Sequence, residues 1–139
     1  MPRIPRTLHM DTEQTFRTAV LEALVDNAAP YFEEAAHFAH THGLQAHTQL
    51  RNGKQLDLRL TLKLADRDTP FIYRIGALAS GQRVVHEKTY GEEVQRLEAT
   101  LESINQTLVE TELAAFFVKA AALQLDYVSQ RHQPGFLMH

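Results

Sequence analysis

Three histidines lie close together near the start of the chain, where the sequence reads EEAAHFAHTHG. Glu34 and His37 form an E-x-x-H pair, a spacing that carboxylate-bridged di-iron bundles use twice, together with two further glutamates. The chain holds this pair only once in a helical context. The zinc motif H-E-x-x-H is also incomplete, because His86 and Glu87 are not followed by the second histidine. Neither of these metal sites is therefore complete.

The group formed by His37, His40 and His42 allows two interpretations. His37 and His40 share one helical face, so two imidazoles could bind a metal, and His47 could add a third ligand only by folding back. Alternatively, the three side chains lie at a helix end, where unpaired backbone carbonyls and the helix dipole favour positive groups. We favour the capping interpretation, and we therefore expect no metal and no other cofactor.

Residues suited to nucleophilic or acid-base catalysis are sparse. The chain has no cysteine, which excludes disulfides and thiolate chemistry, and none of its serines lies in a G-x-S-x-G motif. His86, Glu87 and Tyr90 could transfer protons, but such residues are also typical of a solvated strand edge. We expect a protein that is not an enzyme and that has no catalytic residues.

The length and composition predict a single domain over residues 1–139. A hydrophobic content of 44% is enough to bury one core, and 139 residues are too few for two ordinary domains. The net charge of -3 provides no general attraction for polyanions. No segment approaches the roughly 18 apolar residues that a membrane helix needs, so we expect a cytoplasmic protein. Arginine outnumbers lysine among the 14 basic residues, which suggests a bacterial source.

The N-terminal third predicts a kinked helix, or a helix pair, after an irregular arm at residues 1–10. Asp11 can cap a helix that starts near Thr12, and apolar residues follow at helical spacing. Pro30 lacks an amide hydrogen, so we expect a kink there, and Gly43 is suited to end the second piece.

After Gly43 the hydrophobic period changes from about 3.6 to 2. Leucine occupies every second position from Leu56 to Leu64, and polar or charged residues fill the positions between. Asn52-Gly53 lies between two such alternating segments and is a strong hairpin signal. With further turns at 65–70 and 80–81, the pattern predicts a four-stranded antiparallel meander with one solvated face.

Beyond Gly91, apolar residues recur at alternating spacings of three and four, which predicts a long helix over 94–125 or two stacked helices. Its first five seam residues are Val94, Leu97, Leu101, Ile104 and Leu108. We expect the chain to form a homodimer through this seam, and packing of the seam on the chain's own sheet is the alternative. Residues 129–139 form a tail whose segment 136–138 could contact a partner. The expected fold class is α+β, with the C-terminal helix or helix pair packed on one face of the sheet.

The predicted strands carry most of the basic charge. Residues 44–90 hold eight basic and four acidic residues, whereas the predicted helices on both sides are acidic. If the leucines point inward, Arg51, Arg59, Lys63 and Arg74 gather on the solvated face. We expect these four residues to bind a partner.

The sequence therefore favours a non-enzymatic protein-interaction module, adaptor-like or chaperone-like, that acts as a homodimer. One alternative is a nucleic-acid-binding protein that uses the same basic face, although Phe71 and Tyr73, which could stack on bases, have the parity of core residues. The other is a small-ligand-binding domain with a pocket between the first helix and the sheet, near Tyr31, Phe32 and Phe38.

Overall fold

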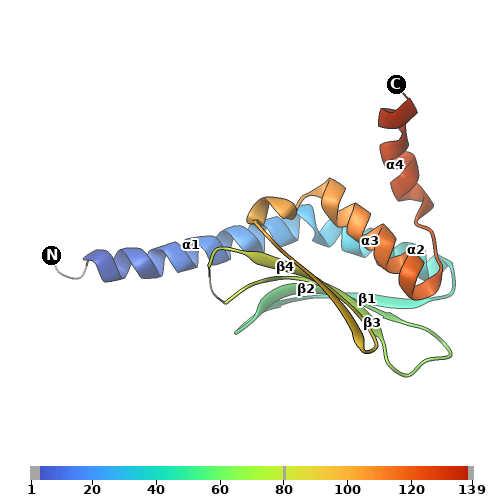
Figure 1. The fold of residues 1–139 in the computed structure, drawn as a ribbon, viewed down its shortest axis with the longest axis horizontal. Helices are drawn as coiled ribbons and strands as arrows, with labels where there is room; N and C mark the ends of the chain where they lie inside the picture. The colour runs from blue at the N-terminus through green and yellow to red at the C-terminus, as the bar shows by residue number, and fades with distance from the viewer. Residues whose placement is uncertain (1–3, 80, 138–139) are drawn as a thin grey trace.

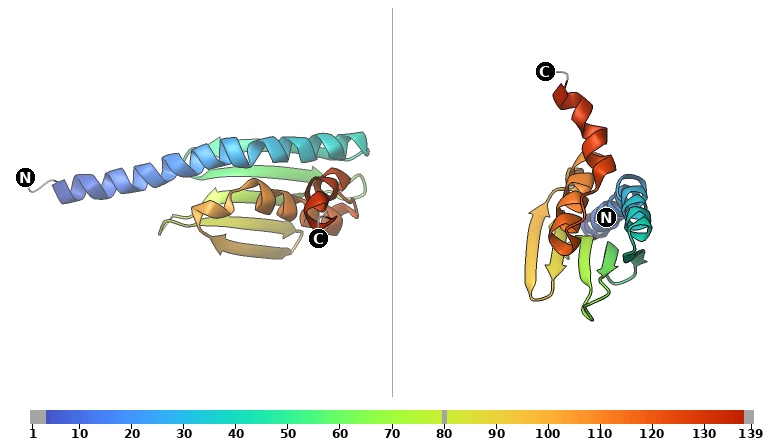
Figure 2. Two further views of the ribbon diagram at one scale, coloured as in Figure 1. Left: turned by 90° about the horizontal axis from the view of Figure 1, so that it is seen from above. Right: turned by 90° about the vertical axis from the view of Figure 1, so that its right-hand side faces the viewer.

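The computed structural model describes residues 4–79 and 81–137, with side chains over 12–79 and 81–132. The fold is α+β, as the sequence predicts: a bent N-terminal helix, an antiparallel sheet and C-terminal helices (Figure 1). The bent helix and the first C-terminal α-helix lie side by side on one face of the sheet (Figure 2). We call this the inner face, and the opposite, uncovered one the outer face.

The N-terminal helix is bent where the sequence predicts it. α1 spans Ile4–Asn27 and α2 spans Ala29–Thr41, with Ala28 between them at a non-helical φ of -131° and Pro30 in the first turn of α2. A proline is tolerated there because the first amide groups of a helix have no partner within it. The predicted irregular arm is wrong over residues 4–10, because α1 already begins at Ile4 with Pro5 in its first turn.

The sheet is a meander in the order β1-β2-β3-β4-β5, with every neighbouring pair antiparallel. The first four strands are β1 Gln45–Asn52, β2 Leu56–Lys63, β3 Phe71–Ala77 and β4 Val84–Tyr90. The predicted hairpin after Asn52 is confirmed, and the amide of Gly53 closes it by donating to the Gln55 carbonyl at 3.1 Å. The alternate leucines of β2 are buried on the inner face, as expected.

A fifth strand replaces the beginning of the predicted long helix. β5 Glu93–Ala99 follows β4 after a two-residue turn in which Gly91 has a φ of 69°. A glycine at positive φ in such a turn matches the twist of the strands on both sides. The helical prediction is wrong for two reasons. β5 is exposed almost throughout, so its sequence shows no alternation of apolar and polar residues. The spacing of Val94 and Leu97 also resembles that of a helix.

Helical structure resumes only after β5, with η1 Leu101–Ser103, α3 Gln106–Ala121 and α4 Asp126–Leu137. α3 begins where the Asn105 side chain accepts a hydrogen bond from the Leu108 amide, and it ends at Ala122, which is left-handed with a φ of 52°.

The predicted dimer seam is therefore divided among several elements. Val94 and Leu97 lie on opposite faces of β5, Leu101 lies in η1, Ile104 precedes α3, and Leu108 lies in α3. The continuous helix that this seam requires does not form, whereas dimerisation itself stays a prediction. The buried face of α3 is instead formed by Val109, Leu113, Phe116, Phe117 and Ala120.

The predicted C-terminal tail is also largely helical, because α4 extends to Leu137. α4 rises away from the sheet, and contacts at its base fix it to the body (Figures 1 and 2). Arg131 donates to Glu34 of α2 at 2.8 Å and to the buried Glu110 of α3. The side chains of 136–138, the predicted contact of the tail, lie outside the described residues.

Aromatic rings join the two helical segments to the sheet. The Tyr73 ring lies 5.1 Å from that of Phe32 in α2 and 6.1 Å from that of Phe116 in α3, measured between centroids, and all three residues are fully buried. Phe38 packs edge-on against Tyr127 at 5.2 Å. Packed rings thus occupy the region where the sequence suggested a ligand pocket. Among the described residues, no helix combines the length and apolarity needed to cross a membrane.

Candidate interaction surface

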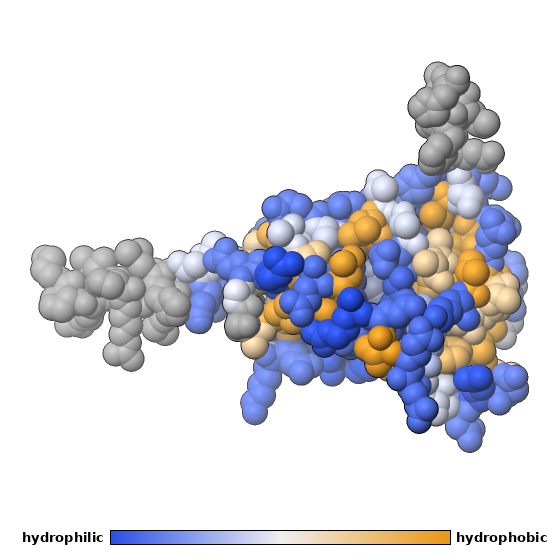
Figure 3. Space-filling model, in the orientation of Figure 1, coloured by the Kyte–Doolittle hydropathy of each residue, from blue (hydrophilic) through white to orange (hydrophobic). Residues whose placement is uncertain are grey.

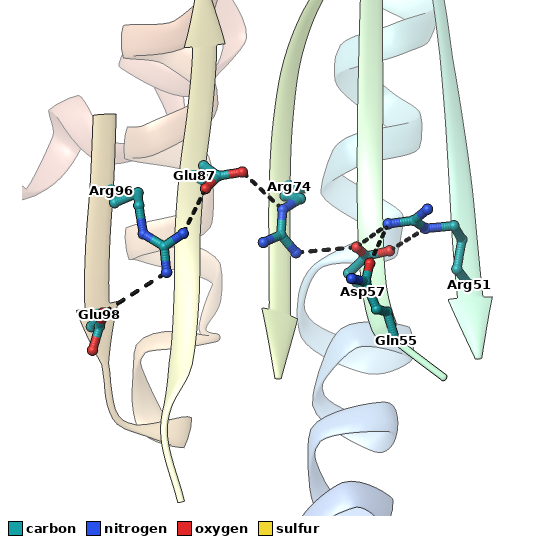
Figure 4. A network of polar contacts seen from close by, with 7 residues as sticks. All are labelled: Arg51, Gln55, Asp57, Arg74, Glu87, Arg96 and Glu98. Carbon is teal, nitrogen blue, oxygen red and sulfur yellow. Dashed lines mark hydrogen bonds and ion pairs between the residues drawn. The ribbon is translucent and has the colours of Figure 1, made fainter. Parts of the chain in front are cut away.

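The register of the strands aligns charged side chains into a network that runs across the outer face (Figure 4). Each of the five strands contributes, because residues opposite one another in an antiparallel sheet point to the same face. The members, in order from β1 to β5, are Arg51, Asp57, Arg74, Glu87, Arg96 and Glu98. Charges of opposite sign alternate along the whole series.

Asp57 is the most buried member of the network, with no exposed surface. Its carboxylate accepts hydrogen bonds from Arg51 Nε at 2.8 Å and Arg51 Nη2 at 2.6 Å, and from Arg74 Nη1 at 3.1 Å. Burial alone would raise the pKa of Asp57, but the hydrogen bonds and charges of Arg51 and Arg74 outweigh it and hold that pKa below its ordinary value. Asp57 in turn raises the pKa of Arg51 through the same hydrogen bonds.

Gly76 provides the space in which Arg74 reaches Asp57. It lies opposite Asp57 in β3, and a Cβ atom placed on it would be 2.7 Å from Arg74 Nη1 and 3.0 Å from Asp57 Cβ. A glycine within a strand often marks such a close approach. The arginine therefore crosses the face above a position that carries no side chain.

Glu87 links the central strands to the edge of the sheet. It accepts a hydrogen bond from Arg74 Nε at 3.0 Å and another from Arg96 Nη1 at 3.0 Å. Arg96 also lies 3.8 Å from Glu98 of its own strand, and both of these side chains are about half exposed. The side chains of the network are thus most buried around Asp57 and most exposed at β5.

Two of the four predicted partner-binding residues are engaged in this network, and two are not. Arg51 and Arg74 meet at Asp57, whereas Arg59 and Lys63 of β2 have no hydrogen-bond or ion-pair partner among the described side chains. The Nε of Arg59 is buried without an acceptor, and Arg59 lies directly opposite Arg74 in the register. Because the residue opposite Arg59 is also positively charged, the charge of Arg59 is not compensated on β2.

The histidines that the sequence singled out contact backbone carbonyls. His42 Nδ1 lies 2.9 Å from the Phe38 carbonyl at the end of α2, which agrees with the capping interpretation, and His40 Nε2 lies 2.7 Å from the Ala46 carbonyl of β1. His37 is exposed on α2. In the described part of the chain, no three His, Cys, Asp or Glu side chains are grouped so that they could hold a metal ion.

A partly buried chain of hydrogen bonds resembles a catalytic relay. Ser103 Oγ donates to the Thr100 carbonyl at 2.8 Å, so His86 Nε2 must donate to Ser103, at 2.9 Å, and Nδ1 accepts from the Tyr73 hydroxyl at 2.9 Å. Burial lowers the pKa of His86, against the opposing charge of Glu112. In this arrangement His86 is a neutral donor toward Ser103 and does not activate it as a base.

A hollow near the sheet lies away from these residues. Its volume is about 570 Å³, and it is formed where α1 passes the turns after β1 and β3, with Phe16, Arg17, Lys54 and Leu78 among its lining residues. Arg17 bridges the same region by donating to the Asn52 side chain at 3.0 Å. Among its described lining residues Glu13 is the single acidic side chain, so these residues supply no pair of acids.

Sequence reasoning missed the acidic half of the network. Asp57 and Glu87 are acidic residues on strands that were expected to be basic, and their pairing depends on the register. Gly76 within a β-strand was the available signal, because a glycine at such a position indicates a close approach.

Comparisons of the chain with protein-family models, with curated proteins and with solved structures found no match. Any functional proposal therefore depends on the surface described above.

Proposed function

We propose that this chain is a non-enzymatic protein-interaction module, adaptor-like or chaperone-like, that acts as a homodimer and binds an acidic segment of a partner protein on its outer face. The observation that carries the proposal is the unpaired Arg59. The three arginines of the neighbouring network are balanced by three acidic residues, whereas Arg59 and Lys63 carry charge that no described side chain balances.

An acidic side chain of a partner would supply what Arg59 lacks. The Nε of Arg59 is enclosed by the protein, whereas the terminal Nη groups of this partly exposed side chain can donate to a docked carboxylate. A guanidinium group can also hold a carboxylate with two parallel hydrogen bonds, which favours one geometry over others. Lys63, two residues along the same face of β2, would add a second positive charge for an extended acidic segment.

The outer face suits a protein segment better than a nucleic acid. Base stacking requires aromatic side chains, and Phe71 and Tyr73 point inward, where both are buried.

The experiment is a binding titration with a fluorescent 12-residue glutamate-rich peptide, followed by anisotropy at low salt. Arg59→Gln should weaken binding about tenfold, as expected for the loss of a charge-assisted hydrogen bond of about 1.5 kcal/mol. Lys54→Gln is the matched control, because Lys54 lies in the β1–β2 turn and its loss changes the net charge equally.

Equal weakening by the two substitutions would contradict a specific role for Arg59, since only net charge would then matter. A single-stranded oligonucleotide of equal charge that binds more tightly than the peptide would favour the nucleic-acid alternative. The homodimer is tested separately by light scattering, which should give a mass near twice 15.8 kDa, and a mass of one chain would contradict it.

A further inference from the structure

β5 is an edge strand that is open on both of its faces. It lies at the border of the sheet, beyond α3 (Figure 2), and six of its seven residues are exposed. Two of them are apolar, Val94 at 51% and Leu97 at 46% exposed. On the side of the molecule shown in Figure 3, hydrophobic residues likewise interrupt an otherwise hydrophilic surface. An edge strand of this kind can pair with another strand.

The free backbone groups of β5 follow from the alternation of hydrogen bonds in the sheet. The Leu78 amide donates to the directly opposite Arg83 carbonyl at 3.0 Å, so the backbone groups of Arg83 point toward β3. Because this direction alternates along an antiparallel strand, the same bond determines which residues of β4 direct their backbone groups toward β3 and which toward β5. Counted through the register, the amides and carbonyls of Val94, Arg96 and Glu98 point away from β4. The Glu98 carbonyl accepts from the Arg83 side chain at 3.1 Å and has a second lone pair available.

The opposite edge of the sheet is less open. α2 lies along β1, where His40 bonds the Ala46 carbonyl and the Thr48 hydroxyl bonds Glu33. The side chains of a covering helix are one way in which proteins protect a sheet edge. Among the described side chains, Glu93 is the one residue of β5 that forms an ion pair with a helix, through Lys119 of α3 at 2.6 Å.

We propose that a second copy of this chain pairs with β5 in antiparallel fashion across a two-fold axis, with Leu97 opposite the partner's Leu97. The proposal rests on the homodimer in the proposed function and names its contact surface. The result is one continuous ten-stranded sheet with both outer faces on the same side.

Charge complementarity selects this register. With Leu97 on the axis, Arg96 lies opposite the partner's Glu98 and the reverse pair repeats across the axis, so two attractive pairs form. The neighbouring registers that keep the faces aligned place Arg96 opposite Arg96, or Glu98 opposite Glu98. Both of those set like charges against each other, and the two apolar side chains no longer meet.

The backbone geometry agrees with the same register. Arg96 and Glu98 are residues whose amides and carbonyls point outward, so they form hydrogen-bonded pairs with the partner. Leu97 then occupies a pair without backbone hydrogen bonds, in which the Cα atoms are about 4.5 Å apart and the side chains are closest. Arg96 keeps its contact with Glu87 on the outer face.

A single introduced cysteine tests the register directly, because the natural chain has none. Leu97→Cys should oxidise almost completely to a disulfide-linked dimer, since the expected Cα separation permits a disulfide. Gln95→Cys is the matched control on the same face of β5. In the proposed register the two Gln95 positions are roughly 13 Å apart, so that variant should stay unlinked.

Charge reversal provides the second test. Arg96→Glu and Glu98→Arg should each raise the dimer dissociation constant about tenfold or more, because both attractive pairs become repulsive. An equal mixture of the two variants should form heterodimers, in which every pair is attractive again. This recovery shows that neither variant is simply misfolded.

The outcomes separate the two proposals. A dimer by light scattering in which Leu97→Cys does not cross-link, or in which Gln95→Cys cross-links instead, would overturn the β5 interface and leave the homodimer intact. A monomer would overturn both the interface and the homodimer, while peptide binding at Arg59 would remain a separate result. Failure of the mixed variants to associate would also overturn the interface.

Discussion

Replacing Asp57 by asparagine removes the central charge of the outer-face network with little change in shape. The wild-type carboxylate accepts three hydrogen bonds from Arg51 and Arg74. An amide oxygen carries no charge, and the amide nitrogen of Asn cannot accept either guanidinium, so those groups lose their partner while Arg59 stays close to Arg74.

The expected loss in the free energy of unfolding is about 2–3 kcal/mol at pH 7. Removing one member of a fully buried ion pair costs about 3–5 kcal/mol. The value is smaller here because the Arg51 and Arg74 side chains are 35% and 22% exposed and can regain water.

The effect should depend on pH in a defined direction. The folded-state pKa of Asp57 lies below its ordinary value of 3.8, so its stabilising contribution is complete above that value and is lost as the pH falls through the folded-state pKa. The difference between wild type and Asp57→Asn should therefore be constant from pH 7 to 5 and shrink below pH 3.8.

Urea unfolding curves of both proteins, from pH 7 to the lowest pH at which both fold, measure this difference. Asp66→Asn is the matched control, because Asp66 is exposed in the β2–β3 turn, and it should change stability by less than about 0.5 kcal/mol. Equal stability of Asp57→Asn and wild type at pH 7 would refute the reasoning, as would a difference that grows on acidification.

Two further substitutions test the packing around the surface and beneath it. Gly76→Ala should lower the free energy of unfolding by about 1–2 kcal/mol, because the new Cβ displaces Arg74 and crowds Asp57, and an unchanged urea midpoint would contradict this. Tyr73→Phe should cost about 1–3 kcal/mol by leaving Nδ1 of the buried His86 without a donor, and a more stable variant would contradict a stabilising hydrogen bond between these two side chains.

The sequence predicts the parts of the fold that local patterns specify. The alternating leucines indicate β2, Asn52-Gly53 indicates the first hairpin, and Pro30 indicates the bend between α1 and α2, and the structure has each of these features. Each depends on a few neighbouring residues whose backbone preferences or period are strong.

The β5 segment has no such pattern, because an edge strand that is open on both faces needs no buried side. Its apolar residues Val94 and Leu97, together with Leu101 just after the strand, fit a helical seam equally well, and only the pairing with β4 decides between the two structures. Gly91, at positive φ in the preceding turn, is the local residue that favours the strand.

Strand pairing, and therefore the tertiary structure, also decides which charges meet in the outer-face network. The sequence places Arg51, Arg59, Lys63 and Arg74 on one face because side-chain direction alternates along each strand, and that is a local property. Which of these charges is neutralised depends on the register between strands, which brings Arg51 and Arg74 to Asp57 and leaves Arg59 and Lys63 without a partner among the described side chains. The alternation of side-chain direction within a strand follows from the local sequence. The alignment of one strand with the next is fixed only when the whole sheet packs beneath its helices.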